Sequence, residues 1–438
     1  MNKTRIFVNA GWIISCKIVK AILTLLVTML TARYLGPYNY GLINYASGIV
    51  AFVTPIMKLG IDAILVHEII KEPNSEGEIL GTSILMNFVS AILCIIGVVA
   101  FASIANRGEQ DTIIVCTLYS LLLIFQAFEM IQYWFQAKLL SKYTSIAMII
   151  SYIVVALFQL FLLINRYGVY WFALSYSIDF GIIAVILLCI YKKKGNGHFK
   201  FSYKRSKILL SIGKFYILSN MMTTIFSQTD KIMLKLFLDN TATGYYAAAT
   251  TCAGMTSFIF AAIIDSARPV IFESKKIELR QFKKSICQLY SVVIYFSLIQ
   301  CIFMTALAPI IIRILYGTQY VPSVDALRIV VWFTTFSYIG TVRDIWILAE
   351  NKQSYLWKIN AIGAITNIIL NSILIPTWGI NGAAVASLIT QIFTNVIVGF
   401  IIKPIKDNNK LLISAIHPKY FIGILRYMKN IIGIKKEV

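Results

Sequence analysis

Long apolar stretches alternate with short polar connections along the whole chain. Each stretch holds about 20 residues or more, which is enough for a helix to cross ~30 Å of hydrocarbon. The connections hold most of the glycine, proline, asparagine and lysine. This pattern predicts an all-α polytopic membrane protein with about twelve transmembrane helices, at residues 10–33, 42–66, 80–104, 112–136, 144–164, 170–191, 210–237, 245–268, 285–313, 325–348, 357–376 and 381–403.

The composition supports this interpretation. Of the 438 residues, 58% are hydrophobic and 13% are charged, whereas an average soluble protein carries about 25% charged residues. Water-soluble enzymes, secreted disulfide scaffolds and disordered chains are therefore excluded. The seven cysteines form no CxxC pair, and the three histidines lie far apart. We therefore expect no metal site.

The net charge of +21 reflects membrane topology. If the N-terminus is cytoplasmic, 28 of the 40 lysines and arginines fall in cytoplasmic segments, against four outside: Arg33, Arg107, Arg166 and Arg313. Membrane proteins show this bias because cytoplasmic loops retain lysine and arginine. We therefore expect both termini in the cytoplasm and no nucleic-acid partner.

A weak internal repeat divides the chain into two halves. The longest polar connection, from Tyr191 to Ser211, separates two sets of six spans. With an offset of 203 residues, Gly41 aligns with Gly244 and Asp62 with Asp265, as expected for a parallel duplication. The predicted organisation is an N-terminal six-helix bundle (1–200), a C-terminal six-helix bundle (201–410) and a cytoplasmic, amphipathic tail (411–438).

The connections leave no room for a catalytic domain. The predicted external loops are roughly ten residues long, and the sequence contains no GxxxxGK[ST], GxSxG or HExxH motif. We therefore expect a transporter and not an enzyme.

Polar side chains within the spans are the candidate site residues, because a charge at the bilayer centre costs about 2.5–3.5 kcal/mol on insertion scales. Many recur at i, i+3 and i+4 spacing, which places them on one helix face. Candidates for a cationic substrate site are Lys17, Lys20, Lys231, Lys235 and Arg343. Acidic candidates for ion coupling are Glu129, Asp62, Asp179, Asp230, Asp265 and Asp344. Polar lining candidates are Thr24, Thr28, Asn220, Thr224, Gln126 and Tyr133.

Structural roles compete with these functional ones. Lysines near span ends, such as Lys17, Lys58 and Lys235, can extend to an interface. Asp230 with Lys231, and Arg343 with Asp344, can form local ion pairs. Lys20 and Lys231 have the strongest claim to a cavity, and Glu129 is the best acidic candidate. Several buried cations would attract a diphosphate, while hydroxyls and amides would bind a glycan; a drug cavity would also need an intramembrane acid.

Three segments resemble the Wzx family of O-antigen and polysaccharide flippases, within the MOP exporter superfamily. The first is NAGWIISCKIVKAILTLLVTMLTARYLGPYNYGLINYA (9–46), which includes RYLGPYNYG; the others are QTDKIMLKLFLDNTATGYYAAA (228–249) and PTWGINGAAVASLIT (376–390). The resemblance implies two six-helix, MOP/MATE-like bundles around a cation-lined cavity, with alternating access.

The same resemblance implies a function in O-antigen or lipopolysaccharide biosynthesis. The substrate would be an undecaprenyl-diphosphate-linked oligosaccharide, moved from the cytoplasmic to the periplasmic leaflet of the bacterial inner membrane. Transport would be antiport driven by a proton or sodium gradient, without a cofactor, and would cooperate with a polysaccharide polymerase and a chain-length regulator.

Three alternatives stay open. A MATE-type drug or cation antiporter shares the fold, but the Wzx-like opening and the several intramembrane lysines favour the flippase. A lipid II flippase would carry a fuller set of cavity arginines, whereas only Arg328 and Arg343 lie in spans here. A glycan polymerase is disfavoured by the short external loops.

Overall fold

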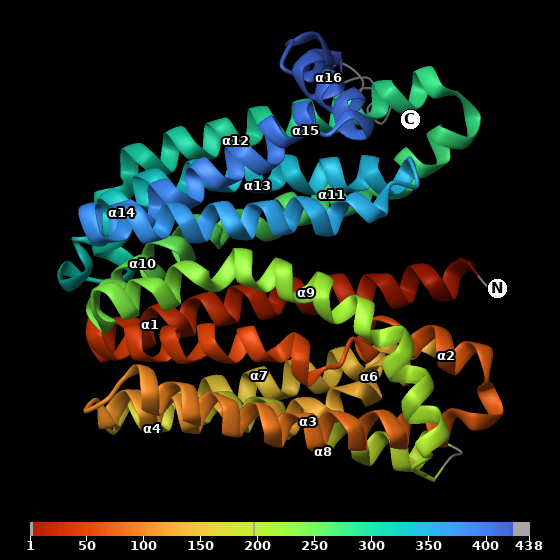
Figure 1. Cartoon of the computed structure of the whole chain (residues 1–438), viewed down its shortest axis with the longest axis vertical. Coiled ribbons are helices and arrows are strands. Elements are labelled where there is room, and N and C mark those ends of the chain that lie inside the picture. The colour runs from red at the N-terminus through yellow and green to blue at the C-terminus, as the bar shows by residue number, and fades with distance from the viewer. Residues whose placement is uncertain (1–2, 196–197, 424–438) are drawn as a thin grey trace, which may run out of the picture. The chain divides into compact units, whose positions relative to one another are not determined.

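The structure, a computed structural model, describes the backbone of residues 3–195 and 198–423 and the side chains from residue 23 onward. Every regular element within these ranges is a helix (Figure 1). The predicted all-α architecture is therefore confirmed.

Ten helices make up the first part of the chain: α1 (Lys3–Met57), α2 (Leu65–Lys71), α3 (Glu76–Ala105), α4 (Gln110–Ser120), α5 (Leu122–Gln126), α6 (Met130–Ala137), α7 (Ser141–Ile164), α8 (Val169–Lys194), α9 (Tyr203–Phe237) and α10 (Asn240–Ala253). The rest consists of α11 (Ser257–Ile277), α12 (Leu279–Leu315), α13 (Ser323–Ala349), α14 (Leu356–Ile392), a π-helical turn η7 (Phe393–Ile397), α15 (Val398–Ile401) and α16 (Lys406–Ala415).

Nine helical stretches of the described residues are long and apolar enough to cross a membrane. Two of them each contain two expected spans, because Gly36 (φ 73°, ψ 170°) in α1 and Gly379 (φ 60°, ψ −135°) in α14 leave helical geometry. Glycine adopts such positive φ angles readily, and the chain turns back on itself at these points (Figure 1). Together with the more highly charged α13, these stretches account for the twelve expected spans.

The chain forms two compact units, Met1–Ala247 and Ala248–Val438. The division falls inside α10 because α9 packs along α1 and α3 and so belongs to the first unit. The boundary predicted near residue 200 separates the two repeated halves of the sequence. It concerns that duplication and not the packing of α9, and it stays a prediction.

Glycines permit the close packing between α1 and the helices α9 and α10. A Cβ atom on Gly41 would lie 1.7 Å from the carbonyl oxygen of Asn240, and one on Gly244 would lie 2.0 Å from that of Pro37. Glycine lets helix backbones approach closely where hydrophobicity gives no driving force. Gly41 and Gly244 are also the residues that the predicted repeat aligns.

Each unit has its own apolar interior. In the first unit one cluster surrounds Tyr45 and Phe172, and a second surrounds Trp134 and Phe135. The second unit is organised around Tyr290 and Trp346. Large apolar side chains are also exposed, as expected for lipid-facing surfaces; examples are Ile96 in α3 and Leu157 in α7.

Candidate functional site

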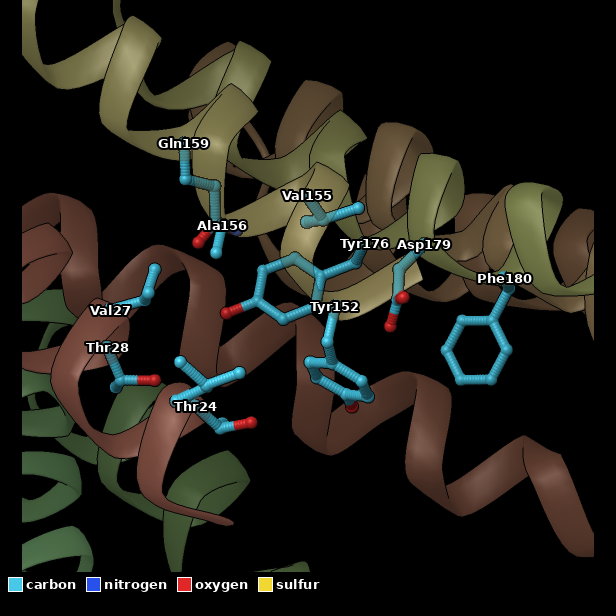
Figure 2. A pocket seen from close by; sticks show the side chains of 11 residues that line it. Thr24, Val27, Thr28, Tyr152, Val155, Ala156, Gln159, Tyr176, Asp179 and Phe180 are labelled. Carbon is cyan, nitrogen blue, oxygen red and sulfur yellow. The ribbon is translucent and has the colours of Figure 1, made fainter. Parts of the chain in front are cut away.

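A cavity of about 140 Å³ lies among α1, α7 and α8 in the first unit (Figure 2). It is lined by Leu23, Thr24, Val27 and Thr28 from α1, by Tyr152, Val155, Ala156 and Gln159 from α7, and by Tyr176, Asp179 and Phe180 from α8. Aromatic and aliphatic groups dominate the lining, and a few polar groups converge on it. That combination is typical of small-molecule sites.

Helical periodicity explains why these residues converge. The α7 residues lie at positions i, i+3, i+4 and i+7. Three residues of α1 (Thr24, Val27 and Thr28) and the three of α8 each lie at i, i+3 and i+4. Side chains with this spacing share one face of a helix. In Figure 2 the threonines of α1 lie opposite the tyrosines and Asp179 of the other two helices.

Hydrogen bonds fix the polar groups of the cavity. The Gln159 amide donates to Ser175 Oγ at 2.6 Å, and the Ser175 hydroxyl donates to the Phe172 carbonyl at 2.6 Å. Ser151 Oγ lies 2.5 Å from Asp179 Oδ1 and 2.8 Å from the Asp179 carbonyl oxygen. Such support holds a binding group in a defined orientation before the ligand arrives.

The cavity contains three of the predicted site residues, Thr24, Thr28 and Asp179. Tyr152, Gln159 and Tyr176 were not among the predicted site residues. The seven-residue spacing of Tyr152 and Gln159 within the fifth span was a usable signal, but that span contains no charged residue to draw attention to it.

A second polar cluster lies where α1 ends, beside the interrupted helix α5–η3–α6. Lys58 Nζ is 3.1 Å from Glu129 Oε2, so the two residues form a salt bridge. Glu129 belongs to a 3₁₀ turn, η3 (Ala127–Glu129), a local geometry often found at functional hinges. Asp62 and Tyr133 contribute to the electrostatic environment of Lys58.

This cluster contains unsatisfied acceptors. The Oδ1 atom of Asp62 and the Oε1 atom of Gln126 are both buried and have no hydrogen-bond partner in the described part of the chain. Buried polar atoms are nearly always hydrogen-bonded. Three residues predicted separately, Asp62, Glu129 and Tyr133, therefore belong to one polar environment around Lys58, and Gln126 lies three residues before Glu129 in the chain.

Lys235 is paired at the end of α9. Its Nζ atom lies 2.8 Å from Glu109 Oε1, and Glu109 also accepts a 2.7 Å hydrogen bond from Thr112. The Lys235 side chain is 7% exposed. Burial alone would raise the pKa of Glu109, but the hydrogen bonds from Lys235 and Thr112 outweigh that effect and lower it. Lys235 therefore forms a structural salt bridge that links α9 to the α3–α4 connection.

Lys231 lies one helical turn before Lys235 on α9 and forms no comparable salt bridge with a described residue. Its neighbour Asp230 accepts a 2.5 Å hydrogen bond from the Tyr246 hydroxyl. Among the residues that the structure describes, no salt bridge involves Lys231. Lys231 packs near Gly48, where an added Cβ would lie 3.7 Å from the lysine Cβ. The other cationic candidates of the first span, Lys17 and Lys20, lie outside the residues whose side chains are described.

The candidates of the second unit form local pairs. Arg343 donates to Asp344 Oδ1 at 2.8 Å, to the Thr394 carbonyl at 3.0 Å and to Asn395 Oδ1 at 2.8 Å. Arg343 is 4% exposed and is bonded to the π-helical turn η7. Asp265 forms an exposed salt bridge with Arg268 at 3.1 Å. In the first unit, Asn220 and Thr224 lie on α9 and do not line the cavity.

Comparison with known proteins identifies the family. The family model described as "Polysaccharide biosynthesis protein" matches residues 6–275. The chain belongs to this family. The membership predicted from the three Wzx-like segments is thereby confirmed.

Two relatives give the extent of the similarity. The capsular polysaccharide biosynthesis protein CapF of Staphylococcus aureus is 22% identical over 400 residues, which cover 87% of this chain and 96% of CapF. An uncharacterized membrane protein of Methanocaldococcus jannaschii is 26% identical over 272 residues, or 58% of this chain. The matched region spans about half, 51%, of that archaeal protein.

Solved structures establish the fold of this family member. The lipid II flippase MurJ in an inward closed conformation matches with a TM-score of 0.71 and 16% identity, over 94% of this chain and 92% of MurJ. A multidrug resistance MATE transporter of the MOP superfamily matches with a TM-score of 0.67 and 12% identity, over 90% and 96%. The predicted MOP/MATE-like architecture is confirmed, while identities this low show the fold alone.

Proposed function

We propose that this polysaccharide biosynthesis protein is a flippase for a lipid-linked glycan. It translocates an undecaprenyl-diphosphate-linked oligosaccharide repeat unit from the cytoplasmic to the periplasmic leaflet of the bacterial inner membrane, with both termini in the cytoplasm. One observation carries the proposal: a chain of the polysaccharide biosynthesis family has the fold of MOP transporters.

The polar groups of the first unit support this substrate class. Lys231 is a cation without a salt bridge among the described residues, and a diphosphate is attracted strongly to such a charge in a low-dielectric environment. The cavity among α1, α7 and α8 offers hydroxyl, amide and carboxylate groups, which suit the hydroxyls of a sugar. The two halves of the substrate would therefore be bound by different chemistry.

The polar cluster around Lys58 supports coupling to a proton or sodium gradient. Because Glu129 is neutralised by Lys58, the unpartnered Asp62 oxygen is the group in this cluster with capacity for a cation. A buried carboxylate oxygen that receives no hydrogen bond can coordinate a cation. We propose Asp62 as the coupling residue and Glu129 as the residue that positions Lys58.

A drug or organic-cation antiporter is the second candidate. The cavity combines Asp179 with the rings of Tyr152, Tyr176 and Phe180, and aromatic faces with a carboxylate also attract an organic cation. The family match favours the glycan substrate.

A deletion strain tests the proposal. Lipid-linked glycans are extracted and assigned to a leaflet by their accessibility to a periplasmic sugar-modifying enzyme. Single repeat units trapped on the cytoplasmic leaflet, with loss of surface polymer, are the expected result. Normal translocation together with increased drug sensitivity would overturn the flippase and support the antiporter. Dependence of surface polymer on the proposed partners, the polymerase and the chain-length regulator, is measured in the parent strain, which still makes polymer.

A further inference from the structure

We infer that a basic cavity at the start of α12 binds the phosphate head group of an anionic membrane phospholipid. The cavity lies in the second unit and has a volume of about 770 Å³. Its walls are the beginning of α12, the end of α16 and Tyr420. The inference concerns the lipid around the protein, so it does not depend on which substrate the protein transports.

Three cations line the cavity on one face of α12. Arg280, Lys283 and Lys284 lie at positions i, i+3 and i+4, and residues with this spacing share a helix face. Cys287, at i+7, continues this face and contacts α16, where its Sγ atom lies 3.5 Å from the Leu411 carbonyl oxygen. This contact fixes the rotation of α12 about its axis and so keeps the three cations at the cavity wall.

The three cations are available to an anion. None of them forms a salt bridge with a residue that the structure describes. The neighbouring salt bridge joins Lys410 to Asp407, and Lys283 contributes to the electrostatic environment of Asp407. Of the described residues that line the cavity, Glu278 alone is acidic. Positive groups therefore outnumber negative ones, and lysine and arginine form strong charge-assisted hydrogen bonds with phosphate oxygens.

The cavity lies at the depth of the lipid head groups. Helix α12 has 37 residues, which makes it about 55 Å long, whereas the hydrocarbon core of a bilayer is about 30 Å thick. The span predicted from the sequence begins at residue 285, directly after Lys284. The three cations therefore lie within about two helical turns of the hydrocarbon, which is where the phosphates of phospholipids are found.

Exposed apolar side chains favour a lipid over a soluble phosphate. Ile413 and Ile416 are 54% and 56% exposed, and Ile413 is adjacent in sequence to Ser414, which lines the cavity. Lys410 is exposed on the same helix. A helix with exposed apolar and basic residues is typical of the membrane interface. The acyl chains of a bound phospholipid can cover these isoleucines while its phosphate meets the cations.

The segment that follows has the wrong charge to fill the cavity. Residues 424–438, outside the described part of the chain, contain four lysines and arginines and one glutamate. Like charges repel, so a cavity with an excess of positive groups favours an anionic lipid over this segment. A basic segment is itself attracted to anionic lipids, and such lipids would therefore be concentrated near the cavity.

Lipid binding is measured on the purified full chain by native mass spectrometry. The probes are dioctanoyl phosphatidylglycerol, which is anionic, and dioctanoyl phosphatidylcholine, which has the same acyl chains and no net charge. We expect the protein to bind phosphatidylglycerol at least fivefold more tightly, and equal affinities would overturn the inference. Binding should persist in an excess of inorganic phosphate. Complete displacement would make the cavity a site for soluble phosphate and would overturn the assignment to a lipid.

A pair of variants with equal charge separates the cavity from general surface charge. The cavity variant carries Arg280→Gln, Lys283→Gln and Lys284→Gln. The surface variant replaces three exposed lysines of the same unit that do not line the cavity, Lys276→Gln, Lys403→Gln and Lys406→Gln. The affinity for phosphatidylglycerol should fall at least fivefold in the first variant and less than twofold in the second. An equal loss in both would show that surface charge alone attracts the lipid.

Glu278→Gln distinguishes lipid binding from structural damage. The Glu278 side chain makes no capping hydrogen bond to α12, so its replacement leaves the helix intact and removes a charge that repels phosphate. The affinity for phosphatidylglycerol should rise at least twofold. An unchanged or lower affinity would contradict a phosphate in this cavity.

Removal of residues 424–438 tests the competing occupant. Every residue that lines the cavity is kept, so the affinity for phosphatidylglycerol should stay within twofold of that of the full chain. Binding found only in the shortened protein would assign the cavity to the removed segment. Binding lost together with the segment would assign the lipid to the segment, and either result would overturn the inference.

Discussion

The charged residues of the spans differ in whether each has a carboxylate partner. Lys58, Lys235 and Arg343 each have a carboxylate partner within 3.1 Å, which offsets the cost of placing them in the membrane. Lys231 has no such partner among the described residues. Lys231 is half-buried and interacts electrostatically with the neighbouring Asp230, and a phosphate of the ligand would supply the close, charge-assisted hydrogen bond that this lysine lacks.

Replacement of Lys231 tests this reasoning. We expect Lys231→Ala to reduce translocation at least tenfold, which corresponds to about 1.4 kcal/mol, while membrane insertion stays unchanged. Lys231→Arg should retain part of the activity if charge is what matters. Translocation is measured as surface polysaccharide at equal protein level. The control is Lys214→Ala, at an exposed position of the same helix, and full activity of Lys231→Ala would remove the role of this cation. The same test applies to Lys20→Ala.

The Lys58–Glu129 salt bridge is expected to contribute to the stability of the fold. Glu129→Gln leaves the partly buried Lys58 without its carboxylate, so the protein should lose on the order of 2 kcal/mol of stability. The loss is less than for a fully buried pair because the two side chains are 19% and 14% exposed. Thermal unfolding in detergent measures it. Lys58→Met combined with Glu129→Leu should restore much of the stability; a double variant as unstable as Glu129→Gln would argue against the pair.

At the level of helices, the sequence predicts which segments span the membrane better than it predicts which helices pack against one another. The first and eleventh spans are predicted to end at residues 33 and 376, and the helices break close by, at Gly36 and Gly379, because turn geometry depends on local sequence. The packing of α1 against α10 depends on Gly41 meeting Gly244, and the packing of the turn after α1 against α9 depends on Gly60 meeting Gly213. No local pattern reveals which of the 24 glycines will meet another.

The Gly41 crossing can be tested with a matched glycine. In Gly41→Ala the new Cβ collides with the Asn240 carbonyl, so α1 and α10 must separate, and we expect loss of both stability and translocation. In Gly97→Ala the Cβ meets nothing within 4 Å, and alanine favours the helix by about 1 kcal/mol. Thermal unfolding of the two variants is the measurement. Equal stability would show that the crossing tolerates a methyl group.

The Lys235–Glu109 pair joins α9 to the α3–α4 connection and is predicted to be sensitive to acid. The pKa of Glu109 is lowered from its ordinary value of 4.5. Its contribution to stability is therefore complete above pH 4.5 and disappears as the pH falls through the lowered pKa.

Thermal midpoints of the unaltered protein and Glu109→Gln measure this contribution. The difference between them should be constant from pH 7 to pH 5.5 and shrink as the pH falls below 4.5. A difference that stays constant into the acid range would contradict the assigned shift. Asp111→Asn is the control, because Asp111 lies nearby in the first turn of α4 and accepts a hydrogen bond from Tyr170 instead.

On the scale of the whole protein, the lysine and arginine distribution predicts topology. A fluorescent protein fused after Val438 should fluoresce, because it folds in the cytoplasm, and alkaline phosphatase at the same position should be inactive. A phosphatase inserted at Asp239, between α9 and α10, should be active. Active phosphatase at the C-terminus would reverse the orientation and the direction of transport with it.

The number of spans, the all-α class and the family follow from the sequence because they depend on local properties. A run of apolar residues is long enough to cross a membrane whatever its neighbours are, and the family segments are contiguous in the chain. These features could be predicted, and the fold and the family are confirmed.

The pairing of side chains between spans depends on packing instead. Lipid and protein interior are similarly apolar, so hydrophobicity does not distinguish the face of a helix that meets another helix from the face that meets lipid. Lys58 and Glu129 are 71 residues apart, and Lys235 and Glu109 are 126 apart. The cavity collects side chains from three helices. Each of these arrangements exists because separate segments pack side by side, and their convergence turns scattered polar residues into a site.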